Sequence, residues 1–225
     1  MGYNASKKVF AGILQVLDSP IIERIEWLGH GSFRIQGLPL IYIDPWRLTK
    51  NVFHADIILV SHDHYDHCSP ADVEKLRGPD TTVLTNGMSQ PHLGDVTVLR
   101  PWQVINVDQV SIKAVPAYNG HHPKEFGGLG FVISMEKMDI YYAGDTDLID
   151  EMSSIHADIA ILPIGGRQTM DVNAAVEAVR RLRPQWVIPS HWGANLEGGS
   201  AMDVRIFADR IQQEGLAQLV MPERK

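Results

Sequence analysis

The sequence predicts an α/β fold in which two sheets pack together and helices lie outside them. Short apolar segments bounded by Gly, Pro or Asn recur through the first two thirds of the 225 residues, as expected for strands. In the last third, such segments alternate with two longer stretches whose apolar residues recur at helical spacing. A helix with one apolar face needs a sheet to cover, so two sheets with helices outside suit this order.

The first third of the chain is expected to open with a helix and to continue as a meander of strands. The apolar stretch from Val9 to Leu17 indicates a helix, within an N-terminal helical extension over residues 1–20. Strands are then predicted over Arg24 to Leu28, Ser32 to Ile35, Leu40 to Ile43 and Asp56 to Val60. Ser69 as N-cap, Pro70 in the first turn and Gly78 as a stop bracket a helix over Ala71 to Arg77.

The rest of the chain reads as strands followed by an alternation of strand and helix. Strands are predicted over Val83 to Thr85, Val96 to Leu99, Val104 to Val107, Val110 to Val115, Phe131 to Met135 and Ile140 to Tyr142. The last third is predicted as a strand over Ile159 to Leu162, a helix over Val172 to Leu182, a strand over Trp186 to Ile188 and a helix between Ser200 and Gly215. The apolar stripes of both helices are assigned to the core.

Composition indicates a single domain over residues 1–225. The hydrophobic fraction is 44%, the charged fraction 21% and the formal charge −7, and the scattered basic residues disfavour nucleic acid as a partner. The single cysteine, Cys68, cannot form an intrachain disulfide, so a reducing, cytoplasmic location is expected. No segment is predicted to span a membrane, and a homo-oligomer is compatible with the sequence.

The segment SHDHYDH, Ser61 to His67, follows the buried strand that ends at Val60. Imidazoles and carboxylates cost free energy to bury unless they are paired or bind an ion, and a solvated loop is not expected between a buried strand and a capped helix. Together they are the ligands that suit zinc, iron or manganese. Their spacing lets His62 and His64 converge while Asp66 and His67 turn toward a second position, so a dinuclear metal centre is predicted.

Two later polar residues end apolar strands in the same way. Asp145 follows Tyr141 and Tyr142, and His191 follows the strand that begins at Trp186. Taken alone, Asp145 would more often be a turn carboxylate or a helix N-cap, and His191 a hydrogen-bonded core histidine. Beside the cluster, both become candidate metal ligands.

In this chain order, the residues resemble the metallo-β-lactamase superfamily of metal-dependent hydrolases. The resemblance covers nearly the whole chain and implies a four-layer αββα sandwich of two mixed sheets. It also implies that His62, His64, Asp66 and His67 serve two metals, that Asp145 bridges them and that His191 completes the second site. The segments Trp27 to Phe33 and Ile43 to Pro45 are similar to the branch that contains ascorbate-6-phosphate lactonase and N-acyl phosphatidylethanolamine phospholipase D.

One ligand of the family pattern has no simple match here. The family usually places a histidine after a middle strand, near the position where Asn119 stands. Asn119 could ligate weakly, His121 or His122 could enter from the loop, or water or substrate could fill the position. Among these alternatives we favour His122.

Other polar residues are candidates for supporting roles. Asp44, at a strand end, is expected to fix the metal loop through hydrogen bonds, although a simple turn Asp before Pro45 explains it equally well. His30 between two glycines is a candidate substrate contact or proton donor, with a backbone-bonded loop histidine as the alternative. Lys124, Arg167 and Gln168 could bind an anionic group or lie in solvent.

The function expected from these residues is hydrolysis by metal-activated water. Two divalent ions, most simply Zn²⁺ with Mn²⁺ or Fe as alternatives, lower the pKa of a bound water and polarise the oxygen of the bond to be cleaved. Asp66 is assigned both as a ligand and as the group that orients this water or moves its proton. The expected substrate is a small phosphodiester, ester or lactone; a nuclease of the same fold and a non-catalytic metal-binding protein are the alternatives.

Overall fold

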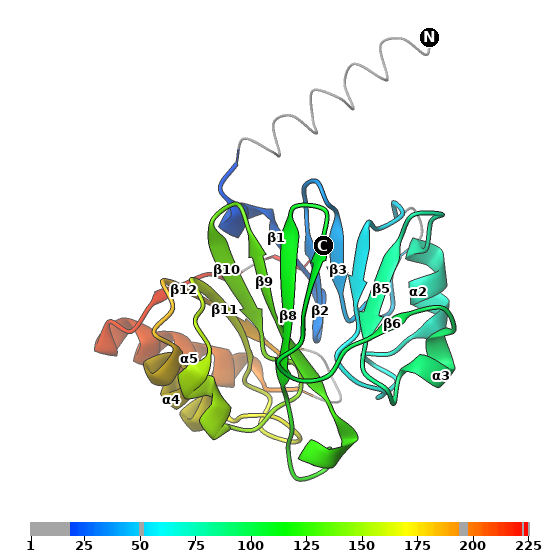
Figure 1. Ribbon diagram of the computed structural model, residues 1–225. Coiled ribbons are helices and arrows are strands. Elements are labelled where there is room, and N and C mark those ends of the chain that lie inside the picture. Colours follow the sequence, from blue (N-terminus) through cyan, green and yellow to red (C-terminus); the bar gives the residue numbers. More distant parts are fainter. Residues whose placement is uncertain (1–18, 50–51, 194–197, 222, 225) are drawn as a thin grey trace.

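The computed structural model describes residues 19–49, 52–193, 198–221 and 223–224. These residues form two sheets that face each other, with helices on the outer side of each (Figure 1). The helix predicted over Val9 to Leu17, and the extension over residues 1–20 for all but its last two residues, lie outside the described part of the chain. The α/β sandwich of two mixed sheets that the sequence predicts is confirmed.

The first sheet has the strand order β1-β2-β3-β4-β5-β6. Its strands are β1 (Ile25–Gly29), β2 (Ser32–Ile35), β3 (Ile41–Ile43), β4 (Ile57–Leu59), β5 (Thr82–Thr85) and β6 (Thr97–Val98). The first three strands are antiparallel to one another, whereas β3 to β6 run parallel. The parallel strands therefore end at one edge of the sheet, and the histidine-rich segment follows β4 at that edge.

The second sheet has the order β13-β12-β11-β10-β9-β8-β7. Its strands are β7 (Val104–Val107), β8 (Val110–Pro116), β9 (Leu129–Met135), β10 (Met138–Tyr142), β11 (Ile159–Pro163), β12 (Trp186–Ser190) and β13 (Gln218–Leu219). Again the earlier strands are antiparallel, and β10 to β13 are parallel. Asp145 and His191 thus follow parallel strands of this sheet.

Ser69, Ser200 and Gly215 cap their helices as predicted, whereas the helix predicted over Ala71 to Arg77 ends at Leu76 with Arg77 as C-cap, before Gly78. In α2 (Pro70–Leu76), the Ser69 side chain accepts a hydrogen bond from the Asp72 amide. Asp171 caps α4 (Val172–Leu182), and Ser200 forms a capping box with Asp203 at the start of α5 (Ala201–Glu214). Gly215 ends α5 in the left-handed conformation.

Three apolar clusters hold the layers together. The largest lies between the sheets and includes Phe33, Ile57, Phe131 and Ile161. A second packs α4 and α5 on the outer face of the second sheet, and a third packs α2 on the outer face of the first. The alternation of side chains along each strand therefore divides its apolar residues between the two faces.

The structure also contains short elements that the sequence analysis did not predict. They are the helix α3 (Gln90–Leu93), strand β13 and the 3₁₀ turns η1 (Ile21–Arg24), η2 (Lys124–Phe126) and η3 (Asp150–Ser154). Such elements span too few residues to carry a periodic signal. Among the described residues, no helix is long and apolar enough to cross a bilayer.

Candidate metal centre

The candidate ligands meet where strands of both sheets end. His62, His64, Asp66 and His67 follow β4, Asp145 follows β10 and His191 follows β12. Two further histidines come from other connections: His30 from the β1–β2 turn and His122 from the segment between β8 and β9. Side chains that are far apart in the sequence therefore share one site because parallel strands of both sheets end there.

One group of possible ligand atoms consists of His62, His64 and Asp145, which offer atoms within 4.8 Å of one another. The ring centroids of His62 and His64 are 4.5 Å apart, as the spacing of the two histidines predicts. His122 lies beside this pair, with its ring centroid 5.1 Å from that of His62 and 5.3 Å from that of His64. A cation here would have imidazole and carboxylate ligands.

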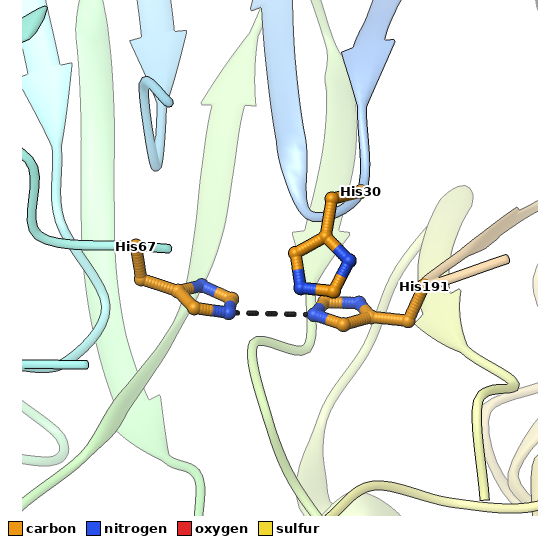
Figure 2. A group of neighbouring side chains, drawn as sticks. All are labelled: His30, His67 and His191. Carbon is orange, nitrogen blue, oxygen red and sulfur yellow. Dashed lines mark hydrogen bonds between the residues drawn. The ribbon is translucent and has the colours of Figure 1, made fainter. Parts of the chain in front are cut away.

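The second group consists of His30, His67 and His191, which converge from three separate connections (Figure 2). The Nε2 atoms of His67 and His191 face each other at 3.4 Å. Oδ1 of Asp145 lies 3.3 Å from Nε2 of His67 and 2.7 Å from Nε2 of His191, while its other oxygen lies 4.0 Å from Nε2 of His62. Asp145 therefore stands between the two groups.

The buried carboxylate of Asp44 orients two of these histidines. It accepts hydrogen bonds from the Ser61 amide at 2.7 Å and the Ser61 hydroxyl at 2.6 Å, and Nδ1 of His67 lies 2.6 Å away. The Ser61 hydroxyl also lies 2.9 Å from Nδ1 of His62. With Nδ1 of each ring engaged by these oxygens, Nε2 is the atom that each ring can present to a cation.

Two buried polar atoms at this site are suited to binding a cation. Nε2 of His62 and Oδ1 of Asp145 are buried and have no hydrogen-bond partner among the described residues. The 2.7 Å approach of His191 to Asp145 is close enough for a hydrogen bond but lacks its geometry. Buried lone pairs without donors cost free energy, and imidazole and carboxylate together suit zinc, manganese or iron.

Burial and neighbouring charges shift the pKa values of His62 and Asp145. Burial lowers the pKa of His62 well below its usual value, and the neighbouring His67 lowers it further. Burial by itself would raise the pKa of Asp145, but His191 and His67 outweigh it and hold that pKa well below its usual range. A neutral His62 and an ionised Asp145 are the protonation states that bind divalent cations.

Gly31 allows the two facing histidines to approach the β1–β2 turn. A Cβ atom on this residue would lie 2.8 Å from Cε1 of His191 and 2.9 Å from Cε1 of His67. Real Cβ contacts are longer, so any larger residue here would push at least one ring out of place.

The three candidate residues after β8, Asn119, His121 and His122, have different surroundings. Nδ2 of Asn119 donates to the carbonyl oxygens of Asp145 and Gln168, and its Oδ1 accepts from the backbone amides of His121 and His122. The amide group is thus fully used in holding the segment. His121 is exposed, whereas His122 is buried, with Nε2 3.2 Å from Asp63. The structure therefore brings His122 to the cluster, and not Asn119 or His121.

Asp66 and His30 form a pair at the edge of the second group. Nε2 of His30 lies 2.9 Å from Oδ2 of Asp66, and the His30 ring packs edge-on against His191 with 4.2 Å between centroids. Burial would raise the pKa of Asp66, but the hydrogen bond from His30 and the charge of His67 lower it overall. Asp66 is therefore held as a carboxylate with one oxygen engaged by His30.

A pocket of about 340 Å³ opens onto these ligands. Its lining includes Asp66, Asp145 and His191 together with Tyr65, Arg167 and Gln168. Lys124, the third candidate for binding an anion, instead forms an exposed ion pair with Glu151. The volume is within the range of sites for small molecules.

Several residues of the site were missed by the sequence analysis. Ser61, Tyr142, Asp63 and Gly31 had no assigned role, although Ser61 and Asp63 lie inside the cluster itself. A polar residue that ends a buried strand was a usable signal for Ser61. The hydroxyl of Tyr142 donates to Oδ2 of Asp44 across the two sheets, a contact that no local sequence pattern indicates.

A two-sheet α/β sandwich with a buried His/Asp centre at its strand ends defines a class of metal-site proteins. The profile of the beta-lactamase superfamily domain matches residues 24–191. The chain belongs to the metallo-beta-lactamase superfamily, as the resemblance in the sequence implied.

Relatives and solved structures agree with this family. A Thermoplasma acidophilum protein named UPF0173 metal-dependent hydrolase is 35% identical over 75% of this chain and 83% of its own length. A Parabacteroides distasonis protein assigned as a metal-dependent hydrolase superposes with a TM-score of 0.79 at 29% identity, covering 89% of this chain and 93% of that one. Igni18, a metallo hydrolase from Ignicoccus hospitalis, gives a TM-score of 0.73 at 25% identity over 89% and 94% of the two chains.

Proposed function

We propose that this protein is a hydrolase that uses two divalent metal ions, most simply zinc, to cleave a small phosphodiester, ester or lactone. One observation carries the proposal: Asp145 stands between two groups of histidines, with Oδ1 toward His67 and His191 and Oδ2 toward His62. A carboxylate between two sets of imidazoles is the arrangement that bridges two cations. The names of the relatives, metal-dependent hydrolases, support the same class of reaction.

The ligands proposed for the first ion are His62, His64 and His122, and those for the second are Asp66, His67 and His191, with Asp145 shared. Divalent ions in such a site lower the pKa of a bound water toward neutrality and polarise carbonyl or phosphoryl oxygens. The protein contributes the orientation of these ligands. Asp44 and Ser61 fix the proton-bearing side of His67 and His62, so that the opposite nitrogen of each ring is presented to the site.

Asp66 is the proposed proton carrier. Its Oδ2 lies 2.9 Å from Nε2 of His30 and 3.9 Å from Nε2 of His67, and its second lone pair would serve the ion. Oδ1 is left to take a proton from the attacking water and return it to the leaving group. The low pKa of this carboxylate, caused by His30 and His67 in spite of burial, keeps it ionised before the reaction. His30 then acts as a positioning residue, because it fixes which oxygen of Asp66 remains available.

The pocket supports a small substrate. It lies directly over the ligands, and Arg167 and Gln168 form part of its wall and could bind a negatively charged or carbonyl group. Its volume of about 340 Å³ suits a small molecule better than a polymer. The formal charge of −7 also disfavours a polyanionic nucleic acid.

The test is metal analysis of the purified protein combined with assays on a model phosphodiester, aryl esters and a panel of lactones. We expect two ions per chain, hydrolysis of at least one substrate class, and loss of activity on chelation with recovery on adding zinc or manganese. His62→Ala should lose both metal and activity, whereas the exposed His92→Ala should retain them. A protein that neither binds nor requires divalent metal, or a His62→Ala variant with unchanged hydrolysis, would refute the proposal.

A further inference from the structure

A second pocket, separate from the one over the candidate metal ligands, has three arginines in its lining. It has a volume of about 140 Å³, and Arg34, Arg47 and Arg224 contribute to its wall beside Tyr42. None of the residues proposed to bind metal lines it. Its cationic character is unusual in a chain whose formal charge is −7.

The arginines reach this pocket from distant parts of the chain. Arg34 lies on β2, Arg47 lies in the segment after β3, and Arg224 pairs through its backbone with Trp27 of β1. Gly29 has no side chain, so the Arg224 guanidinium can lie against it: a Cβ there would be 2.9 Å from Nε. Two hydrogen bonds from backbone amides to Asp72, one of them from Arg47, hold the segment after β3.

The positive charge of the pocket is only partly balanced. Glu26 pairs with Arg34 and also accepts a hydrogen bond from Gln36. Within the described part of the chain, the guanidinium groups of Arg47 and Arg224 form no ion pair or hydrogen bond. The Arg47 group instead stacks on Trp46, 4.1 Å from the ring centroid, which leaves its N–H edge available.

We propose that Arg34, Arg47 and Arg224 form a second binding site, which takes the phosphate group of a small ligand. Arg47 and Arg224 have no counter-charge among the described residues, and a phosphate in the pocket would supply one and accept several charge-assisted hydrogen bonds. The oxygens of a phosphate dianion point in tetrahedral directions, so they can accept hydrogen bonds from all three arginines that line the pocket. The volume leaves room for such a group with a few waters, since each water occupies roughly 30 Å³.

Trp46 packs against residues of both sites. Besides Arg47, its ring lies 5.4 Å from that of His30 and 6.0 Å from that of Tyr65, which lines the metal pocket. A phosphate that draws the Arg47 guanidinium inward would therefore act on the side chain that packs against His30. The two sites are therefore connected through Trp46, which contacts Arg47 of one and His30 of the other.

Titration calorimetry with inorganic phosphate tests the site, using the full-length protein as purified and again after removal of metal by chelation. Phosphate at a metal centre is lost with the metal, whereas phosphate bound by arginines persists. We expect one site in the chelated protein, weakened about tenfold or more by Arg224→Gln and abolished in Arg47→Gln/Arg224→Gln. Both residues are exposed, and melting curves verify that the variants fold. Arg180→Gln, which removes an arginine paired with Glu214 on the surface, is the matched control.

The same titration with glycerol phosphate distinguishes a site for free inorganic phosphate from a site for the phosphate group of an organic molecule. Binding at least as tight as that of inorganic phosphate would assign the site to a phosphorylated organic molecule, and weaker binding would assign it to free phosphate. Phosphate affinity and stoichiometry that remain unchanged in the double variant would overturn the proposal, as would no binding to the chelated protein. Neither result depends on whether the metal centre hydrolyses a substrate.

Discussion

The hydroxyl of Tyr142 lies 2.7 Å from Oδ2 of Asp44 and joins the two sheets at the edge that carries the candidate metal centre. Tyr142 ends β10 in the second sheet, whereas Asp44 follows β3 in the first. Both side chains are almost completely buried. The carboxylate that orients His67 is therefore itself held by the strand that leads to Asp145.

Replacing Tyr142 by Phe removes this hydroxyl and little else. A hydrogen bond to a buried charged group contributes about 1.5–3 kcal/mol, so we expect Tyr142→Phe to lower the free energy of unfolding by about that amount. Metal content should change little, because Ser61 and His67 still hydrogen-bond to Asp44. Urea unfolding of the two proteins measures the difference. A stability equal to that of the wild type would mean that the bond between the sheets contributes nothing.

In contrast to Tyr142→Phe, Asp44→Asn should act mainly on metal binding. An amide cannot accept from Ser61, His67 and Tyr142 together, because one of its two heavy atoms is a donor. Loss of such an orienting carboxylate lowers metal affinity about 10–100-fold. Competition with a chromophoric chelator measures this affinity, and the exposed Asp80→Asn is the control. Equal affinity in the two variants would show that Asp44 does not orient the ligands.

The segment after β8 offers a matched pair of histidine variants. His122 is buried beside His62 and His64, whereas the adjacent His121 is exposed. We expect His122→Ala to weaken the binding of one of the two ions and His121→Ala to leave both unchanged. Metal content after dialysis against a weak chelator gives the comparison. If the two variants behave alike, His122 is not a ligand.

Cys68 should be inert in the folded protein. The residue is buried directly after His67, and burial raises the pKa of its thiol to about 11. Because the thiolate is the reactive form, almost none of it is available at pH 8. We expect a thiol-specific reagent to modify no cysteine in the native protein and one cysteine in denaturant. Rapid labelling of the native protein would mean that this thiol is accessible and activated.

The sequence was enough to predict the parts of the structure that depend on local pattern. The helical spacing of apolar residues located α4 and α5, and the run of imidazoles and carboxylates after β4 indicated the candidate metal centre. The strand-end positions of Asp145 and His191 also predicted that they lie near this cluster, because parallel strands end at one edge.

Contacts between distant segments could not be predicted in this way. Tyr142 and Asp44 are separated by 98 residues, and only the packing of one sheet on the other brings them together. Likewise, the pattern around Asn119 left three candidates open, and the hydrogen bonds of its amide to four backbone groups became visible only in three dimensions. The arginine pocket has the same origin, since Arg34 and Arg224 meet only through the edge of the first sheet.

The most direct test of the central claim is anomalous diffraction at the zinc absorption edge from crystals of the zinc-loaded protein. We predict two peaks in each chain: one beside His62, His64 and Asp145, and the other beside His67, His191 and Asp145. The two peaks should share the Asp145 carboxylate. A structure at full zinc occupancy with no peak at these residues, or with a single ion that does not contact Asp145, would contradict the account.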